Sequence, residues 1–273
     1  MRLGSQVGMN ELYASGTDGD LLVEEIFTGT TEGWYDEPGH GDHVSVEGIV
    51  AHGVYHPPCL TAKLPVVAPF TEVASTLPGT RPEALQRRIE DVSRAAVDAL
   101  NLDTCGTHTE IRLDPGGTVT LIETGARSGG LLLTRQIDEV HSIDPIAMLV
   151  DEQLGREVGC PSRMLTTADR AAASVGVIPT NAAVIPWPTR SPRRPDLVNW
   201  ARIVSPGTRV EEIKAFSMPV GEPVPSYDPS GGSRNWLGLF VVHAPDAHQL
   251  HRDCHAVLDN LEAELGRSLG QRG

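Results

Sequence analysis

Apolar and polar residues alternate along several short segments of the chain. Because successive side chains of a strand point to opposite faces of a sheet, this period of two predicts β-strands. Gly53 divides the run at 43–56, which therefore reads as two strands. The proline-punctuated segment 57–80 is expected to be irregular. Strands are expected at 21–27, 43–56, on both sides of a turn at 114–117, and at 171–179, 201–220 and 236–244.

A spacing of three and four residues predicts a helix over about 80–100. Thr80 can cap this helix, Pro82 suits its first turn, and Glu83 favours its positive end. The apolar residues recur at helical intervals and therefore form one stripe. The stripe consists of Leu85, Ile89, Val92, Ala96 and Leu100.

Two further helices are expected. Asp144 and Pro145 start one that runs to about Gly155. The other spans roughly 246–266, and its apolar residues share one face. This face carries Leu250, Cys254, Val257, Leu258, Leu261 and Leu265. Mixed strands with a few helices predict an α+β fold, and residues 156–172 read as a boundary within it.

Composition narrows the classes of function. The 273 residues are enough for one large domain or two small ones. The formal net charge of −14 argues against nucleic acid or an anionic membrane as a partner. No apolar run reaches the ~18 residues of a membrane helix. The four cysteines are widely spaced and contain no CxxC pair, which favours a cytoplasmic protein without a zinc motif or a disulfide framework.

The hairpin around the turn at 114–117 carries one glutamate on each strand. A two-residue loop pairs His108 with Glu123, and the register slipped by one residue along both strands pairs Glu110 with Glu123 directly. Either register places the two glutamates on the same face. A three-residue loop would separate them.

Two carboxylates on one face of a hairpin repel each other by a few tenths to ~1 kcal/mol when they are directly opposed. A divalent cation would offset that repulsion, and oxygen ligands suit magnesium carried by a nucleotide. Arg127 follows the second strand, and its planar fork suits phosphate oxygens. His108 shares the face of the carboxylates. The alternative is an ordinary solvent-facing hairpin with surface acids.

The hairpin sequence THTEIRL…GTVTLIETGARSGG resembles the metal-binding strand pair of the ATP-grasp superfamily. In that family one strand ends in an acid and is followed by a short turn. An apolar strand comes next and leads into Glu-x-Asn-x-Arg and a glycine-rich loop. Three earlier segments agree in order. LLVEEIFTG (21–29) is similar to the hinge strand that holds adenine, HVSVEGIVAHG (43–53) to the strand pair that follows, and LTAKLP (60–65) to a segment bearing a phosphate-directed lysine.

The resemblance implies a domain organisation. The chain would be the C-terminal half of an ATP-grasp protein, with an antiparallel sheet and flanking helices, plus a small α/β C-terminal subdomain. Residues 1–20 would be a remnant of the lid, 21–155 the nucleotide- and metal-binding core, and 156–273 the C-terminal subdomain.

The resemblance also implies ATP and Mg²⁺ as cofactors and assigns roles to residues. Glu110 and Glu123 would be the magnesium ligands. Arg127 would bind the transferring phosphate or an acyl-phosphate intermediate. Lys63 and His108 would lie near the triphosphate, and the adenine site would be lined by Glu24, Glu25 and Phe27.

The chain departs from the family pattern in two ways. Gly125 stands where the family often has a metal-ligating Asn, so a water is expected to substitute. The family also has an N-terminal α/β domain and two phosphate-binding lysines on the lid, whereas Lys63 is the first lysine here. We therefore expect a truncated chain, with the remainder in a longer protein or a partner chain, and an exposed face that favours homo-oligomers.

The expected reaction is that of an ATP-dependent carboxylate–amine ligase, which joins amino-acid-like substrates through an acyl phosphate. Biotin carboxylase chemistry is disfavoured because the segment 128–135 after Arg127 contains no acid to deprotonate bicarbonate. The main alternative is a non-catalytic ATP-grasp remnant that acts as a binding or regulatory subunit. A plain β-rich binding domain would leave the ordered motifs unexplained.

Overall fold

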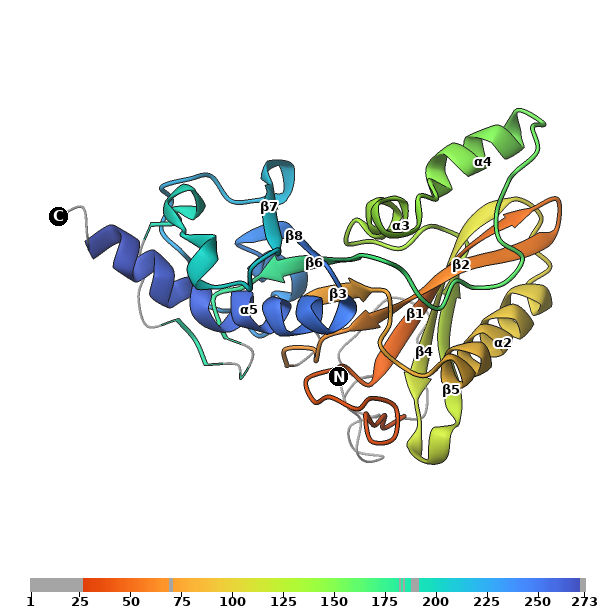
Figure 1. Cartoon of the computed structure of the whole chain (residues 1–273), viewed down its shortest axis with the longest axis horizontal. Coiled ribbons are helices and arrows are strands. Elements are labelled where there is room, and N and C mark those ends of the chain that lie inside the picture. Colours follow the sequence, from red (N-terminus) through yellow and green to blue (C-terminus); the bar gives the residue numbers. More distant parts are fainter. Residues whose placement is uncertain (1–26, 69–70, 182, 184, 188–191, 271–273) are drawn as a thin grey trace, which may run out of the picture.

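The computed structural model describes residues 27–68, 71–181, 183, 185–187 and 192–270 (Figure 1). The strands are β1 (His43–Ala51), β2 (Val54–Lys63), β3 (Ala74–Leu77), β4 (Cys105–Leu113), β5 (Val119–Gly125), β6 (Ala171–Val177), β7 (Arg209–Ile213) and β8 (Gly238–Ala244). The helices are α2 (Glu83–Ala99), α3 (Leu133–His141), α4 (Pro145–Gln153) and α5 (Ala247–Gly270).

The strands form one sheet in the order β5-β4-β1-β2-β3-β6-β8-β7, and each neighbouring pair is antiparallel. This arrangement confirms the predicted α+β class with an antiparallel sheet and flanking helices. Among the described residues, no helix is both long and apolar enough to cross a membrane.

Helices cover both faces of the sheet (Figure 1). Along β6, Ala173 packs into the apolar cluster that α5 covers, whereas the neighbouring Ala172 packs against Ile137 and Val140 of α3. On the other half of the sheet, Ile89 of α2 packs on the same side as α5. The face below α3 and α4 is the polar one, and it carries the candidate site.

The predicted C-terminal helix is confirmed, because α5 buries its apolar stripe against β6 and β8. All of the residues assigned to that stripe from the sequence are buried: Leu250, Cys254, Val257, Leu258, Leu261 and Leu265. The helix that follows Asp144 is confirmed as well, and the Asp144 carboxylate accepts hydrogen bonds from the backbone N–H groups of Ile146 and Ala147.

The predicted helix at 80–100 exists as α2, but two details of the prediction were wrong. Thr80 does not cap it, since the N-cap residue is Pro82 and makes no side-chain hydrogen bond. Leu100 is half exposed instead of lying in the buried stripe. The buried face is polar in part, because the segment after α4 returns along the helix and supplies Arg163 and several backbone groups as hydrogen-bond partners. It contains Gln86, Ile89, Glu90, Ser93 and Val97.

The expectation of an irregular segment at 57–80 was wrong, since this segment contains most of β2 and all of β3. Pro57 and Pro58 are tolerated because the pairing with β1 shifts register between Glu47–Cys59 and Ile49–His56, which places the prolines at a bulge opposite Gly48. The short β3 pairs with β2 only at Ala62 and Lys63, so the prolines interrupt no ladder on that side.

Other differences concern the extent of elements. Helix α3 was not predicted, although Leu133, Ile137 and Val140 follow a helical spacing and are buried. The strand expected at 201–220 is limited to β7, and 3-10 turns occupy Trp200–Arg202 and Lys214–Phe216. Most of the strand predicted at 21–27 lies outside the described residues.

The predicted domain division stays a prediction. The sheet is continuous across the proposed boundary at 155–156, because β3 pairs with β6 from Ala74–Val175 to Leu77–Ala172. The proposed lid remnant at 1–20 lies outside the described residues.

Candidate active site

Polar side chains line one face of the sheet across four neighbouring strands, β4, β1, β2 and β3. The alternation of β1 places Ser45 and Glu47 on this face, opposite Glu110 and His108 of β4. Lys63 lies on the same face of β2 and pairs with Ser75 of β3. These side chains are buried except for Glu110, which is partly exposed. A buried polar face inside a large sheet requires internal hydrogen bonds, and the structure shows them.

Glu110 and Glu123 are direct cross-strand neighbours on β4 and β5. The turn alone would not produce this pair. Leu113 pairs with Val119, and if that register continued, Glu110 would lie opposite Ile122 and Glu123 would point to the other face. The register shifts between Glu110 and Ile111, and Ile122 is the extra residue of that bulge. Direct opposition was one of the two registers expected from the sequence, but a bulge produces it instead of a slipped turn.

His108 connects Glu110 to a second buried carboxylate, Glu47. The His108 Nδ1 atom lies 2.7 Å from Glu47 Oε1, and its Nε2 atom lies 3.2 Å from Glu110 Oε1. Burial alone would lower the pKa of His108, but hydrogen bonds to Glu110 and Glu47 outweigh it and raise the pKa to about 9. The imidazolium therefore donates to both carboxylates at neutral pH.

The hydrogen bond from His108 also holds the pKa of Glu110 below its usual range. Glu110 is thus ionised at neutral pH, the state in which a carboxylate binds a cation. Glu123 is more exposed than Glu110 and lies 3.9 Å from the guanidinium of Arg127, measured between Oε1 and Nη2. Arg127 is itself exposed, and its Nη1 donates to the carbonyl of Ser128 at 3.2 Å.

The glycine-rich loop after Arg127 packs directly on the carboxylate–histidine pair. The backbone N–H of Gly129 donates to Glu47 Oε2 at 3.3 Å. A Cβ atom at Gly129 would lie 2.6 Å from His108 Nδ1 and 2.8 Å from Glu47 Oε2, so this position has no space for a side chain. Glu47 therefore ties the loop and His108 together.

Lys63 makes its contacts within the sheet. Its Nζ atom donates to Ser75 Oγ at 2.9 Å and lies 3.7 Å from Glu72 Oε2. Burial would raise the pKa of Glu72, but a hydrogen bond from His43 and the charge of Lys63 lower it to about 2. The predicted role of Lys63 beside a triphosphate stays a prediction.

The predicted adenine-site residues are only partly described. Phe27 is half exposed and lies outside any strand. Glu24 and Glu25 lie outside the described residues.

Sequence reasoning missed Glu47 as a member of the site. A signal was present, because His43, Ser45 and Glu47 occupy alternate positions of an otherwise apolar run and therefore share one face. Glu72 was also missed, since it lies in the segment that was expected to be irregular.

The residues present fit a magnesium ion that is shared with a ligand. Among the described residues, no three His, Cys, Asp or Glu side chains form a metal site by themselves. Glu110 and Glu123 supply two adjacent carboxylates, the donor type that magnesium prefers, and Mg²⁺ in nucleotide sites commonly takes its other ligands from phosphates and water.

The sheet is antiparallel, it carries opposed acids on the two strands at one edge, and an arginine follows them. This arrangement is the one expected of the ATP-grasp superfamily, and comparisons with known proteins confirm that resemblance. The chain is 33% identical over 146 residues to the alanine–anticapsin ligase of Bacillus subtilis, a match that covers 53% of this chain and 31% of that ligase. The chain thus spans about a third of the length of this relative. No family model matches the chain.

Solved structures share the fold. The L-amino acid ligase from Bacillus licheniformis matches with a TM-score of 0.61 and 21% identity over 82% of this chain and 53% of that protein. The phosphoribosylglycinamide synthetase from Anaerococcus prevotii matches with a TM-score of 0.58 and 12% identity over 77% of this chain and 49% of that protein. At these identities the structural matches establish the fold alone.

Proposed function

We propose that the chain is the metal- and nucleotide-binding part of an ATP-dependent carboxylate–amine ligase that forms an amide or dipeptide-like bond through an acyl phosphate. The observation that carries this proposal is the direct opposition of Glu110 and Glu123, with Arg127 four residues after Glu123. Two opposed carboxylates are unfavourable without a cation between them.

The substrates are proposed to be amino-acid-like. The sequence relative is a ligase named for alanine and anticapsin, and one structural neighbour is an L-amino acid ligase.

In the proposed mechanism Glu110 and Glu123 would hold Mg²⁺, and Arg127 would bind the phosphoryl group that is transferred to the carboxylate. Bound Mg²⁺ supplies charge neutralisation on the phosphates. His108 donates to Glu110 Oε1, which fixes the orientation of this carboxylate. Glu47 contacts both His108 and the backbone of Gly129, so it fixes the glycine-rich loop relative to the strand that carries His108 and Glu110.

The proposal is tested by ADP release from the complete protein or complex that contains this chain, in the presence of Mg²⁺, ATP and a panel of L-amino acids. Amino-acid-stimulated ADP release is expected, together with a condensed product of matching stoichiometry detected by mass spectrometry. ATP binding without stimulated ADP release for any pair of amino acids would contradict the ligase proposal and would leave a nucleotide-binding subunit as the better account.

A further inference from the structure

Helix α4 presents an apolar stripe to solvent. Ile146, Val150 and the C-cap residue Leu154 follow one another at intervals of four residues and therefore lie in one line along the helix. They are 51%, 52% and 59% exposed. The inner side of the helix is packed, because Met148 lies against the apolar cluster that contains Ile137 of α3. Figure 1 shows α4 at the outside of the molecule.

No charged residue interrupts this stripe. The exposed residues of α4 and its C-cap are Ile146, Ala147, Val150, Gln153 and Leu154. A surface helix normally turns charged and polar residues toward water, and the chain as a whole carries a formal net charge of −14. An uncharged apolar stripe on such a chain indicates a surface that a partner covers.

The apolar surface continues beyond the end of the helix. The tip of the β1–β2 hairpin and the end of α4 border an open hollow of about 490 Å³. It is lined in part by Val54 of the hairpin, which is 56% exposed, and by Val158 of the segment after α4. Gly155, which follows Leu154, also lines it, so the hollow adjoins the C-terminal end of the stripe.

The stripe is complementary to a second copy of itself. Val150 lies at its centre, with Ile146 and Leu154 four residues away on either side. In an antiparallel pair of helices the two copies of Val150 meet, and Ile146 of each copy lies at the level of Leu154 of the other. Ala147 then lies at the level of Gln153 of the other copy, so a small side chain leaves room for a larger one.

The charges at the two ends of the helix fit the same arrangement. Asp144 caps the N-terminus through its Oδ1 atom, and Arg156 follows the C-terminus. In the antiparallel pair Arg156 lies at the level of Asp144 of the other copy, so opposite charges come together at both ends. Arg156 contacts Asp151 at 2.8 Å in an exposed ion pair. Because such a pair contributes little, Arg156 can change partner at little cost.

We propose that α4 forms a homodimer interface, in which its stripe packs antiparallel against α4 of a second copy of the chain. The helix has 9 residues, so it is about 14 Å long at 1.5 Å per residue. Interfaces below about 1,200 Å² are typical of weak or transient complexes. Two helices of this length belong to that class, and the expected dissociation constant is micromolar. The proposal does not depend on ligase activity.

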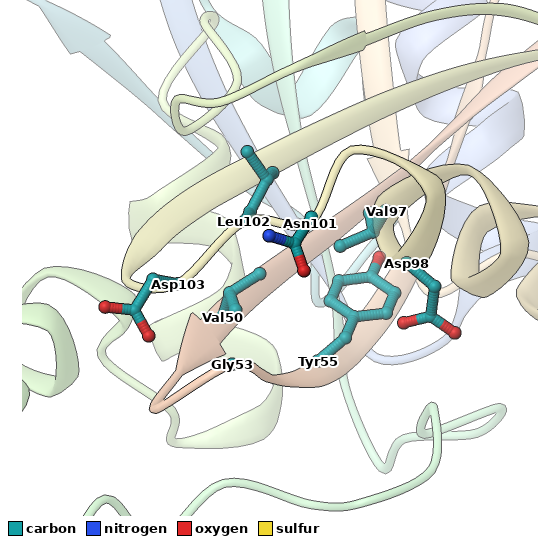
Figure 2. Close-up of a pocket in the computed structure, with 8 residues that line it drawn as sticks. All are labelled: Val50, Gly53, Tyr55, Val97, Asp98, Asn101, Leu102 and Asp103. Atoms are coloured by element: carbon teal, nitrogen blue, oxygen red, sulfur yellow. The ribbon is translucent and has the colours of Figure 1, made fainter.

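The other side of the β1–β2 hairpin is unsuited to such a contact. A second hollow of about 450 Å³ lies there, and Tyr55, Asp98, Asn101 and Asp103 are among the residues that line it. Figure 2 shows the Asp98 and Asp103 side chains on opposite sides of Tyr55, with carboxylates that point away from each other. Both aspartates are exposed. A second copy docked there would bring like charges together, which favours the α4 side of the hairpin.

The test is sedimentation equilibrium of the complete protein that contains this chain, between about 1 and 500 µM. The mass should rise from one copy toward two across this range. A constant mass of one copy would overturn the proposal, and it is the result expected if another part of the complete protein or a different partner covers the stripe.

Val150→Glu makes the test specific, because it places two like charges on the symmetry axis of the dimer. It should raise the dissociation constant about 10-fold or more. Val220→Glu is the matched control, since Val220 is 56% exposed and lies between β7 and β8. This control should associate as the wild type does, and both variants should melt as the wild type does by circular dichroism. Unchanged association of Val150→Glu would overturn the proposal.

Two further variants test the antiparallel register. Ile146→Glu and Leu154→Arg should each weaken association when present alone, because each places a charge against an apolar side chain. An equimolar mixture of the two should associate about 10-fold more tightly than either variant alone, since an antiparallel pair brings the two new charges together. No gain on mixing would overturn the proposed arrangement.

Discussion

At the scale of single residues, the series Glu47–His108–Glu110 is the most constrained part of the candidate site. Each member is fixed by the next, with 2.7 Å between the first pair and 3.2 Å between the second. The imidazolium contributes stability while it stays protonated. Since its pKa is raised to about 9 in the fold, this contribution is complete below the ordinary value of 6.5 and is lost as the pH rises through about 9.

Gly129→Ala tests this constraint. The new Cβ atom would lie 2.6 Å from His108 Nδ1, which is closer than van der Waals contact allows, so His108 or the loop must move. We expect Mg²⁺-dependent ATP binding to weaken by about 10-fold, by analogy with the loss of groups that orient metal ligands. Gly130→Ala is the control, because a Cβ atom there meets nothing within 4 Å. Equal effects of the two variants would show that the contact at Gly129 is unimportant.

Gly125→Asn tests the departure from the family pattern. A Cβ atom at this position makes ordinary contact with Arg127 Cγ at 3.4 Å, so a side chain fits. Position 125 shares the face of Glu123, and the new amide oxygen should add a ligand to the ion. We expect tighter Mn²⁺ binding, measured by electron paramagnetic resonance with Mn²⁺ as the probe. Weaker binding would show that a side chain at this position disturbs the site.

Sequence reasoning could place Glu110 and Glu123 on one face, but not for the correct reason. Their opposition depends on Ile122, a residue with no special chemistry that happens to be the extra one of a bulge. Bulges depend on how a strand fits its neighbour, so the local sequence does not reveal them. Glu47 was recoverable in principle, because alternation alone places it beside the predicted site.

At the scale of elements, α2 is held by a buried glutamate. Glu90 Oε2 accepts from Arg87 at 2.8 Å, and its Oε1 accepts from Arg163 at 2.9 Å and from the backbone N–H of Met164 at 3.2 Å. Arg94 completes the set at 3.0 Å. These contacts tie the helix to the chain segment that follows α4.

Glu90→Gln should therefore destabilise the fold by about 2 kcal/mol, measured by urea unfolding, because charge-assisted hydrogen bonds are weakened. Burial would raise the pKa of Glu90, but hydrogen bonds from Arg87 and Arg163 lower it overall. The contribution is thus present above the unfolded pKa of about 4.5 and is lost as the pH falls below it. Glu83→Gln, an exposed change on the same helix, should stay within about 0.5 kcal/mol. Equal losses in both variants would contradict this account.

Element prediction succeeded where the pattern is long and failed where the tertiary context decides. The stripe of α5 runs over four turns and was located correctly. Only the start of β2 was predicted, because Pro57 and Pro58 normally argue against a central strand, and only the bulge opposite Gly48 makes room for them. Helix α3 was missed because no capping residue precedes it, and Leu131 and Leu132 both adopt positive φ before it starts.

At the scale of the whole molecule, a stack of aromatic side chains joins the loop before β1 to α5. The ring of His40 lies between those of Tyr35 and His251, with 3.8 Å between ring centroids on each side. Burial and the neighbouring His251 and His255 lower the pKa of His40 to about 3. His40 is therefore neutral in the fold.

Acid should unfold the molecule partly through this stack. Because the unfolded histidine takes up its proton near 6.5, the stability that the neutral ring provides is present above that pH and declines as the pH falls toward 3. His40→Phe keeps the stacking and removes the titration, so the fall in Tm between pH 6.5 and 4 should become shallower. An unchanged slope in His40→Phe would contradict the assignment.

The central claim is that Glu110 and Glu123 hold a metal ion for ATP. The most direct measurement is equilibrium binding of ATP to the chain with and without Mg²⁺, for the wild type, Glu123→Gln and the exposed control Glu32→Gln. We predict that Mg²⁺ tightens ATP binding about 10-fold or more in the wild type and in Glu32→Gln, and that Glu123→Gln loses this effect. ATP binding that is independent of Mg²⁺, or equally dependent on Mg²⁺ in Glu123→Gln, would contradict the claim.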